Sequence, residues 1–185
     1  SADTSMFVDT KIVRENTNDT LMTLEGNYYT MRKNNNLDFN LYLDDMDISV
    51  VNVFTKGILS RVDGKASGKF SIDGSLKKPV FIGEAQINNG TCNIDYLNTY
   101  YRINPDGYDG AFKPHIRSYE NRINLEDIVL VDTANNYAVA NGYITHDYFK
   151  DFDFNIDANL NNFIAMNMPK KDNASFYGAA VASGD

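Results

Sequence analysis

The chain of 185 residues contains no tryptophan, one cysteine, two histidines and four prolines. A lone cysteine excludes an internal disulfide. Cys92 stands beside Ile94 in an alternating segment, so we expect a small buried hydrophobic side chain rather than a reactive thiol. His115 and His146 lie far apart in the sequence, with no cysteine or carboxylate at metal-ligand spacing. We therefore expect no metal site and no cofactor.

Positive charge and long apolar runs are also scarce. With 17 basic and 25 acidic side chains, the net charge is -8, and such a surface repels nucleic acid. No apolar run approaches the roughly 18 residues of a membrane-spanning helix, and no amino-terminal signal is visible. The chain begins at Ser1 and stops in mid-pattern at Asp185, which indicates a piece of a longer protein. Nothing divides it, so residues 1–185 are expected to form a single all-β fragment.

Apolar and polar residues alternate one for one along most of the chain. In residues 62–74 the apolar or small side chains fall on every second position, and lysine, serine and aspartate fill the others. A period of two predicts strands with one dry and one wet face, in an antiparallel sheet. Besides 62–74, strands are expected over residues 7–15, 20–31, 37–43, 79–88, 91–101, 122–132, 137–145 and 152–160.

Three segments interrupt this pattern. Ile48, Val51 and Phe54 are spaced by three, which predicts one short helix between Asp47 and Lys56. Asn89-Gly90, between two alternating segments, predicts a hairpin turn. From Asn104 to about Tyr119 the sequence predicts a long irregular loop.

No motif supports catalysis. Gly64–Ser71 has the wrong glycine spacing for a phosphate loop, and a strand follows where a helix should begin. Asp151, Asp153, Asn155 and Asp157 resemble a calcium loop, but Ile156 and Asn162 stand where glycine and glutamate are needed. There is no Gly-x-Ser-x-Gly elbow and no nucleophile with a histidine close in sequence. We expect a protein that is not an enzyme.

Three segments carry a family resemblance. They are "VDGKASGKFSIDGSLKKPVFIGEAQINNG" (62–90), "INLEDIVLVDTANNYAVANGYITHDYF" (123–149) and "FYGAAVASGD" (176–185). Their glycine, proline and asparagine spacings resemble the TamB (translocation and assembly module) group of AsmA-like cell-envelope proteins. The resemblance covers residue 44 to the end, with Asn135 at a turn where glycine is expected.

The resemblance implies an elongated antiparallel sheet curled into a U-shaped trough, the β-taco, with an apolar inner face. Proteins of this group span the periplasm of two-membraned bacteria. They conduct phospholipids between the inner and outer membranes or support assembly of outer-membrane proteins. The implied partners are a phospholipid or other acyl-chain ligand and an outer-membrane barrel assembly protein, and the full-length protein would be membrane-anchored outside this fragment.

Such a trough would present the apolar positions of the alternating strands to its ligand. The side chains expected to line it are Leu41, Phe70, Ile72, Phe81, Ile87, Ile94, Phe154 and Ile156. Two other interpretations stay open. In a closed β-sandwich the apolar faces would pack on each other, giving a binding or adhesion module of a secreted protein. A sheet with open edges could instead bind a partner by strand addition.

Overall fold

The computed structural model describes residues 4–53, 55, 57–106, 114–175 and 177–184. The fold is all-β with one short helix, as the alternation predicts. In chain order the elements are β1 (Ser5–Val13), β2 (Thr20–Tyr29), β3 (Leu37–Asp47), the 3-10 helix η1 (Ile48–Val53), β4 (Leu59–Ser75), β5 (Lys78–Ile94), β6 (Thr99–Ile103), β7 (His115–Ser118), β8 (Arg122–Val131), β9 (Tyr137–Thr145), β10 (Asp153–Met168) and β11 (Gly178–Gly184).

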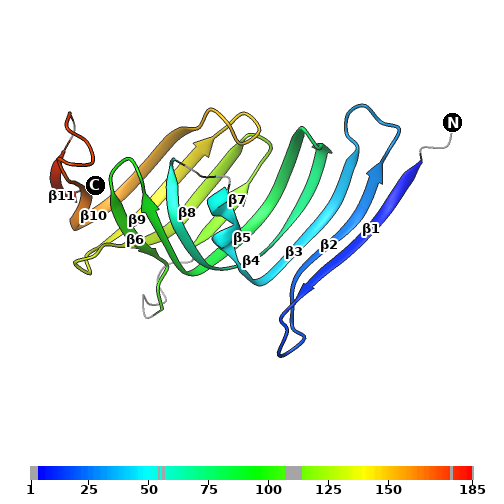
Figure 1. Cartoon of the computed structure of the whole chain (residues 1–185), viewed down its shortest axis with the longest axis horizontal. Coiled ribbons are helices and arrows are strands. Elements are labelled where there is room, and N and C mark those ends of the chain that lie inside the picture. Colours follow the sequence, from blue (N-terminus) through cyan, green and yellow to red (C-terminus); the bar gives the residue numbers. More distant parts are fainter. Residues whose placement is uncertain (1–3, 54, 56, 107–113, 176, 185) are drawn as a thin grey trace.

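All eleven strands belong to one antiparallel sheet in which almost every strand pairs with its neighbours in sequence. The order runs from β1 at one end to β11 at the other, and Figure 1 shows these two strands at opposite ends of the molecule. The strands bow strongly, and η1 lies inside the curve (Figure 1). We call the face that η1 covers the inner face.

Four strands form a closed ring of pairings: β5 pairs with both β6 and β7, and each of these two strands also pairs with β8. β6 pairs with residues 90–94 of β5, and β7 pairs with residues 83–85 of the same strand. The two short strands therefore occupy successive stretches of one position between β5 and β8. At the gap between them the Asn104 side chain donates to Ile87 O (2.9 Å) and accepts from Val129 N (2.8 Å). It thus substitutes for the missing strand residues.

The two faces of the sheet differ in polarity over most of its length, as a period of two requires. On the outer face of β8 and β9, however, Val129, Val131 and Val139 form a small buried cluster. The outer face carries ion pairs between neighbouring strands. Arg117 of β7 contacts Glu126 of β8 at 2.6 Å and Glu84 of β5 at 3.6 Å. Such cross-strand pairs on an exposed face contribute little energy individually, but they keep that face solvated.

A closed core occupies one end of the inner face. Its buried members come from η1, β4, β5, β6, β9 and β10, and they are Ile48, Val62, Ala66, Cys92, Tyr101, Ala138 and Phe163. Tyr101 stacks on Phe163 with ring centroids 5.0 Å apart, and its hydroxyl donates to Ile164 O at 2.8 Å. The carboxyl-terminal half of β10 therefore folds over β6 and seals this end.

Cys92 is buried, as predicted, at 6% exposure, and burial raises the pKa of its thiol to about 11. The helix is confirmed at Ile48–Val53, although it is 3-10 rather than α, and its predicted members Phe54 and Lys56 lie outside the described residues. β-branched side chains disfavour a longer α-helix here. Residues 107–113 of the predicted loop, and Phe176 and Asp185 of the last family-like segment, also lie outside them.

Two turn predictions are wrong. Asn89-Gly90 makes no hairpin, because β5 runs through it without a break and the chain reverses after Ile94. Asn89 has φ 49°, which accommodates a bulge in the strand instead. The predicted loop up to Tyr119 also contains a strand, β7, which returns to the position that β6 left.

Candidate functional site

A row of apolar residues crosses the inner face from β1 to β10. The registers place one residue from each of nine strands in this row: Ile12, Met22, Leu43, Gly68, Ala85, Ile116, Leu125, Gly142 and Ile156. Since neighbouring strands lie about 4.8 Å apart, the row is roughly 40 Å long. It contains no charged residue and no polar side chain.

A second row runs beside the first, two residues further along each strand. It contains Thr10, Leu24, Leu41, Phe70, Gly83, Ser118, Ile123, Ile144 and Phe154. Phe39, Ile72 and Phe81 continue a shorter third row over β3, β4 and β5. We call these three rows together the apolar band.

Of the eight side chains that the sequence predicts to line a trough, six lie in the apolar band and two pack against the closed core. Leu41, Phe70, Ile72 and Phe81 lie in the middle of the band and are half-buried. Phe154 and Ile156, both in β10, lie in it with 56% and 44% of their surfaces exposed. Ile87 and Ile94 are on the same face, but they pack against the closed core.

Sequence reasoning missed much of the band. Met22, Leu24, Phe39, Leu43, Ile116, Ile123, Leu125 and Ile144 belong to it as fully as the predicted residues do. Most of them stand in alternating segments, so the period of two was the available signal. Ile116 lacked that signal, because its short strand was predicted as loop.

Glycines in the band let the backbones of neighbouring strands approach. A Cβ added to Gly83 would lie 2.1 Å from Lys69 O and 2.7 Å from Phe70 Cα. Gly142 has φ 139°, and a Cβ there would lie 2.2 Å from Asn155 O. Such contacts are too short for any side chain, so these positions require glycine where the sheet bends.

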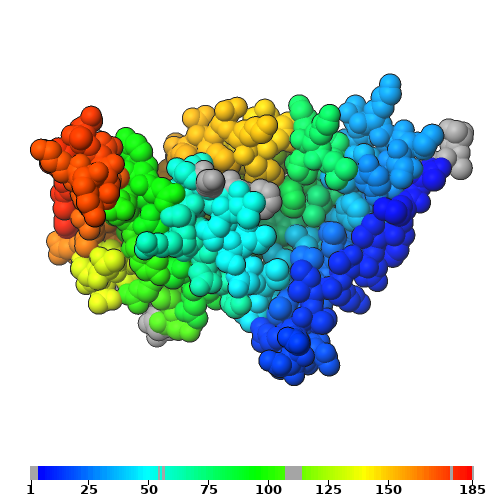
Figure 2. Space-filling model, viewed as in Figure 1, coloured from blue at the N-terminus to red at the C-terminus, as the bar shows by residue number. Residues whose placement is uncertain are grey.

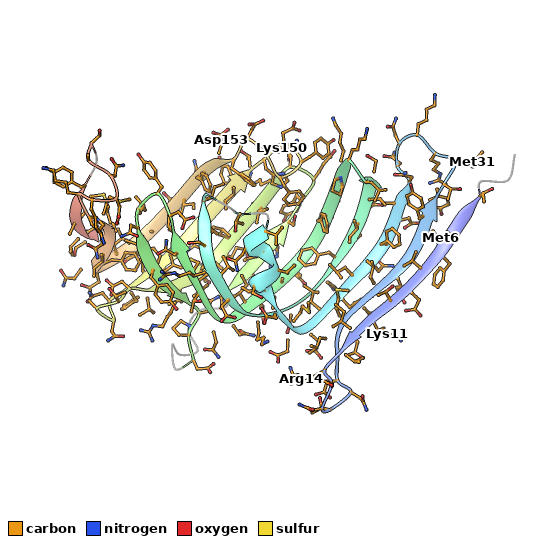
Figure 3. The ribbon with its side chains drawn as sticks, viewed as in Figure 1. Met6, Lys11, Arg14, Met31, Lys150 and Asp153 are labelled. Carbon is orange, nitrogen blue, oxygen red and sulfur yellow. The ribbon has the colours of Figure 1, made fainter. Side chains whose placement is uncertain are left out.

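The connection between β9 and β10 forms one rim of the band. Phe149 packs edge-on against Phe81 of β5, with ring centroids 5.5 Å apart, and stacks on His146 at 4.6 Å. Figure 2 shows this gold segment along the upper edge of the molecule, with the cyan region around η1 below it. Figure 3 shows Lys150 and Asp153 at the same rim, where their charges border the apolar face.

His146 is 5% exposed, so it is buried at the end of β9 rather than on the surface. Its Nδ1 accepts a hydrogen bond from Phe149 N at 3.3 Å, and its Nε2 is buried without a partner among the described residues. Burial lowers the pKa of His146, and the nearby Asp147 carboxylate opposes this effect only partly. A neutral His146 therefore closes the rim connection.

A polar pocket of about 210 Å³ lies at the closed end, between β6 and β10. Its one carboxylate is Asp132, which is 2% exposed. The Asp132 oxygens accept from the backbone N of Ala134 (2.8 Å), Asn136 (2.9 Å) and Ile164 (2.9 Å). Burial alone would raise the pKa of Asp132, but these bonds outweigh it and lower the pKa below its ordinary value. Because its oxygens already accept these hydrogen bonds, the Asp132 carboxylate links the turn after β8 to β10 and is not available as a general base.

Across the described ranges, no three His, Cys, Asp or Glu side chains come together in a way that could hold a metal ion. In the same part of the chain, no helix has the length and apolarity to cross a membrane. The arrangement that stands out chemically is thus the apolar band with its charged rim. Comparisons with protein-family models, curated proteins and solved structures found no match to this chain.

Proposed function

We propose that the inner face is an apolar trough that binds acyl chains. The observation that carries the proposal is the apolar band, which crosses nine strands without a charge and leaves Phe154 and Ile156 exposed. One leaflet of a bilayer holds acyl chains about 15 Å deep, half of the ~30 Å hydrocarbon core. A band of roughly 40 Å can therefore accommodate a chain along its full length.

The energetics favour such a ligand. Each methylene that leaves water contributes about 0.8 kcal/mol, so fifteen methylenes contribute on the order of 12 kcal/mol if fully covered. A half-open face covers them only in part, so binding is weaker and reversible. Reversible contact along an extended surface suits movement of a lipid, and it requires no catalytic residue.

In the cell, we propose a non-catalytic segment of a TamB-like envelope protein in the periplasm of a two-membraned bacterium. Phospholipid would be its ligand, and an outer-membrane barrel assembly protein a further partner. The sequence spacings described above and the apolar band support this assignment from independent directions. Native mass spectrometry of protein purified from bacterial cells would then show a co-purified phospholipid.

The direct test uses fluorescently labelled palmitate and pairs of adjacent substitutions. Phe154→Asp and Ile72→Asp introduce a carboxylate on the inner face. Asn155→Asp and Ser71→Asp introduce one at the adjacent residue of the same strand, on the outer face. We expect the inner-face variants to weaken binding at least about tenfold, or ~1.4 kcal/mol, with a folded circular dichroism spectrum. The outer-face variants should bind as the unmodified protein does.

Two results would contradict the proposal. Unmodified protein that fails to bind the palmitate probe excludes an acyl-chain trough. Inner-face variants that unfold uniformly, while the outer-face variants and Asp153→Lys stay folded, indicate a packed interior in which a buried carboxylate is intolerable.

A further inference from the structure

The edge of β1 that faces away from β2 carries a separate, self-complementary interaction surface. β1 pairs with β2 on one side and has no partner strand among the described residues on the other. Thr30 N donates to Thr4 O at 3.2 Å, so Thr4 and every second residue after it direct their backbone groups toward β2. Phe7, Asp9, Lys11 and Val13 therefore direct their N–H and C=O groups toward the open edge.

Exposed apolar side chains lie on both faces of this edge. On the outer face Phe7 is 67% and Val13 50% exposed, and on the inner face Met6 is 54% and Ile12 39% exposed. Figure 3 shows Met6 and Lys11 along the edge, with Arg14 at its hairpin end. Proteins usually protect an edge strand with proline, a bulge or covering segments, because unpaired backbone groups there recruit other strands. Apart from a register shift at Ile12/Val13, the protection here is limited to Asp9 and Lys11.

The charges at this edge are unbalanced in one copy of the chain. Asp9 lies directly opposite Glu25 of β2, a like-charge pair that destabilises a sheet. Neither Asp9 nor Lys11 forms an ion pair or hydrogen bond through its side chain to any residue the structure describes. A cation opposite Asp9 on the open side would relieve the repulsion.

We propose that two copies of this chain pair through β1, antiparallel and centred on Thr10. In this register Asp9 faces Lys11 of the second copy, and Lys11 faces its Asp9. Phe7 meets Val13 on the outer face, and Val8 meets Ile12 on the inner face. The residues with outward-directed backbone groups pair with one another, as the ladder requires. Two-fold symmetry makes every contact occur twice.

Other registers and other edges fit less well. Moving the centre by one residue, to Asp9 or to Lys11, places two aspartates or two lysines directly opposite each other. The other edge without a partner among the described residues belongs to β11, whose residues 178–184 offer no charge to complement Asp9 or Lys11. A two-fold dimer is therefore favoured over head-to-tail assembly. The pairing does not depend on a ligand in the apolar band.

Sedimentation velocity across a concentration series tests the dimer with charge reversal. The protein should move from a 20.8 kDa monomer to twice that mass. Asp9→Lys and Lys11→Asp should each raise the dimer Kd at least about tenfold, because each variant creates two like-charge contacts per dimer. Mixing the two single variants should restore dimers, and so should the double variant Asp9→Lys/Lys11→Asp. Asp153→Lys, on the outer face of β10, is the matched control and should dimerise normally.

Three outcomes would overturn the proposal. The unmodified protein could remain monomeric throughout the series. The single variants could dimerise as well as the unmodified chain does, or the mixture could fail to recover, and either result rules out the Asp9–Lys11 register. Growth of mass without limit would indicate head-to-tail pairing of β1 with β11. Because palmitate binding is measured separately, none of these outcomes bears on the acyl-chain trough.

Discussion

Asp132 shows how one buried side chain can organise segments that are distant in sequence. It follows β8 directly, and its carboxylate accepts bonds from the turn to β9 and from Ile164 in β10. Ile164 is also where the Tyr101 hydroxyl donates. The closed end of the sheet is therefore fixed by hydrogen bonds as well as by the Tyr101–Phe163 stack.

Replacing Asp132 should destabilise the fold in a pH-dependent way. Asp132→Ala leaves buried donors unpaired and should lower the free energy of unfolding by about 3 kcal/mol, with a smaller loss for Asp132→Asn. Because the folded-state pKa is lowered, the carboxylate stabilises the fold at neutral pH, and this contribution disappears as the pH falls below ~4. Urea titrations at pH 7 and pH 3 should show a smaller acid loss in Asp132→Asn than in the unmodified protein.

Gly83 tests whether the close approach of strands in the band is essential. Gly83→Ala should cost about 1–3 kcal/mol, since the new Cβ would overlap the backbone of β4. Chemical denaturation measures the loss. Asn88→Ala, on the outer face of the same strand, should change stability by less than ~0.5 kcal/mol. A neutral Gly83→Ala would mean that the strands can separate without cost.

At the scale of elements, bulges interrupt four of the strands. Register shifts fall in β3, β4, β8 and β10, next to Asp45, Arg61, Asp127 and Asn162, all with positive φ. At several of these positions a side chain on the adjacent strand accepts the freed N–H, as Ser67 Oγ does for Asp45 N at 3.0 Å. Asn104 plays a related part between β6 and β7.

Asn104→Ala should therefore weaken the junction of β5, β6 and β8. It leaves Ile87 O and Val129 N without their partner and should lower the free energy of unfolding by about 1–3 kcal/mol. Thermal unfolding measures the effect. Asn155→Ala, exposed on β10, is the control and should melt as the unmodified protein does. A melting temperature of Asn104→Ala equal to that of the unmodified protein would show that water replaces the Asn104 amide.

The β9–β10 connection should loosen in acid. His146 has a lowered pKa when folded, so its neutral form stabilises the fold above its ordinary pKa of ~6.5, and this contribution is lost as the pH falls through the lower folded value. Protonation also removes the Nδ1 acceptor of Phe149 N. Melting temperatures at pH 7.5 and pH 5 should differ more in the unmodified protein than in His146→Phe. A similar difference between the two pH values in His146→Phe would show that another group titrates.

How far the sequence predicts these elements depends on the range of the interactions. Residues 137–145 form a strand with the predicted bounds, because alternation reflects a strand with one face turned toward the rest of the protein. The Asn89-Gly90 pair gave a wrong hairpin prediction, because the left-handed backbone conformation of Asn89 occurs both in hairpin turns and in bulges. Only the pairing with the neighbouring strand decides between the two. Likewise, alternation placed Ile87 on the inner face, but only the fold of β10 over β6 reveals that it packs against a core.

At the scale of the whole molecule, stability is unevenly distributed. Buried core residues concentrate in η1, β4, β5, β6, β8, β9 and β10, whereas β1 and β2 contain none. Local opening is therefore expected to be easiest at the amino-terminal end of the sheet.

Hydrogen exchange should reveal this gradient. In the monomeric Asp9→Lys variant, which removes any effect of pairing through β1, amides of β1 and β2 should exchange faster than those of β5, β6 and β9. Mass spectrometry of peptic peptides measures the rates. Phe163→Ala should accelerate exchange at the closed end by removing the stacking partner of Tyr101. Uniform exchange from β1 to β10 would instead indicate a single cooperative unit.

The nearly sequential pairing of strands has a mechanical consequence. A chain pulled from its two ends would lose β1, β2 and β3 one at a time at low force, because each is held by its neighbours alone. The tie between Tyr101 and Ile164 instead bridges 63 residues and closes a loop that contains β7, β8 and β9. Tension reaching this clasp should release the enclosed strands in one large step. The molecule would thus be compliant at its amino-terminal end and resist extension at the Tyr101–Ile164 clasp.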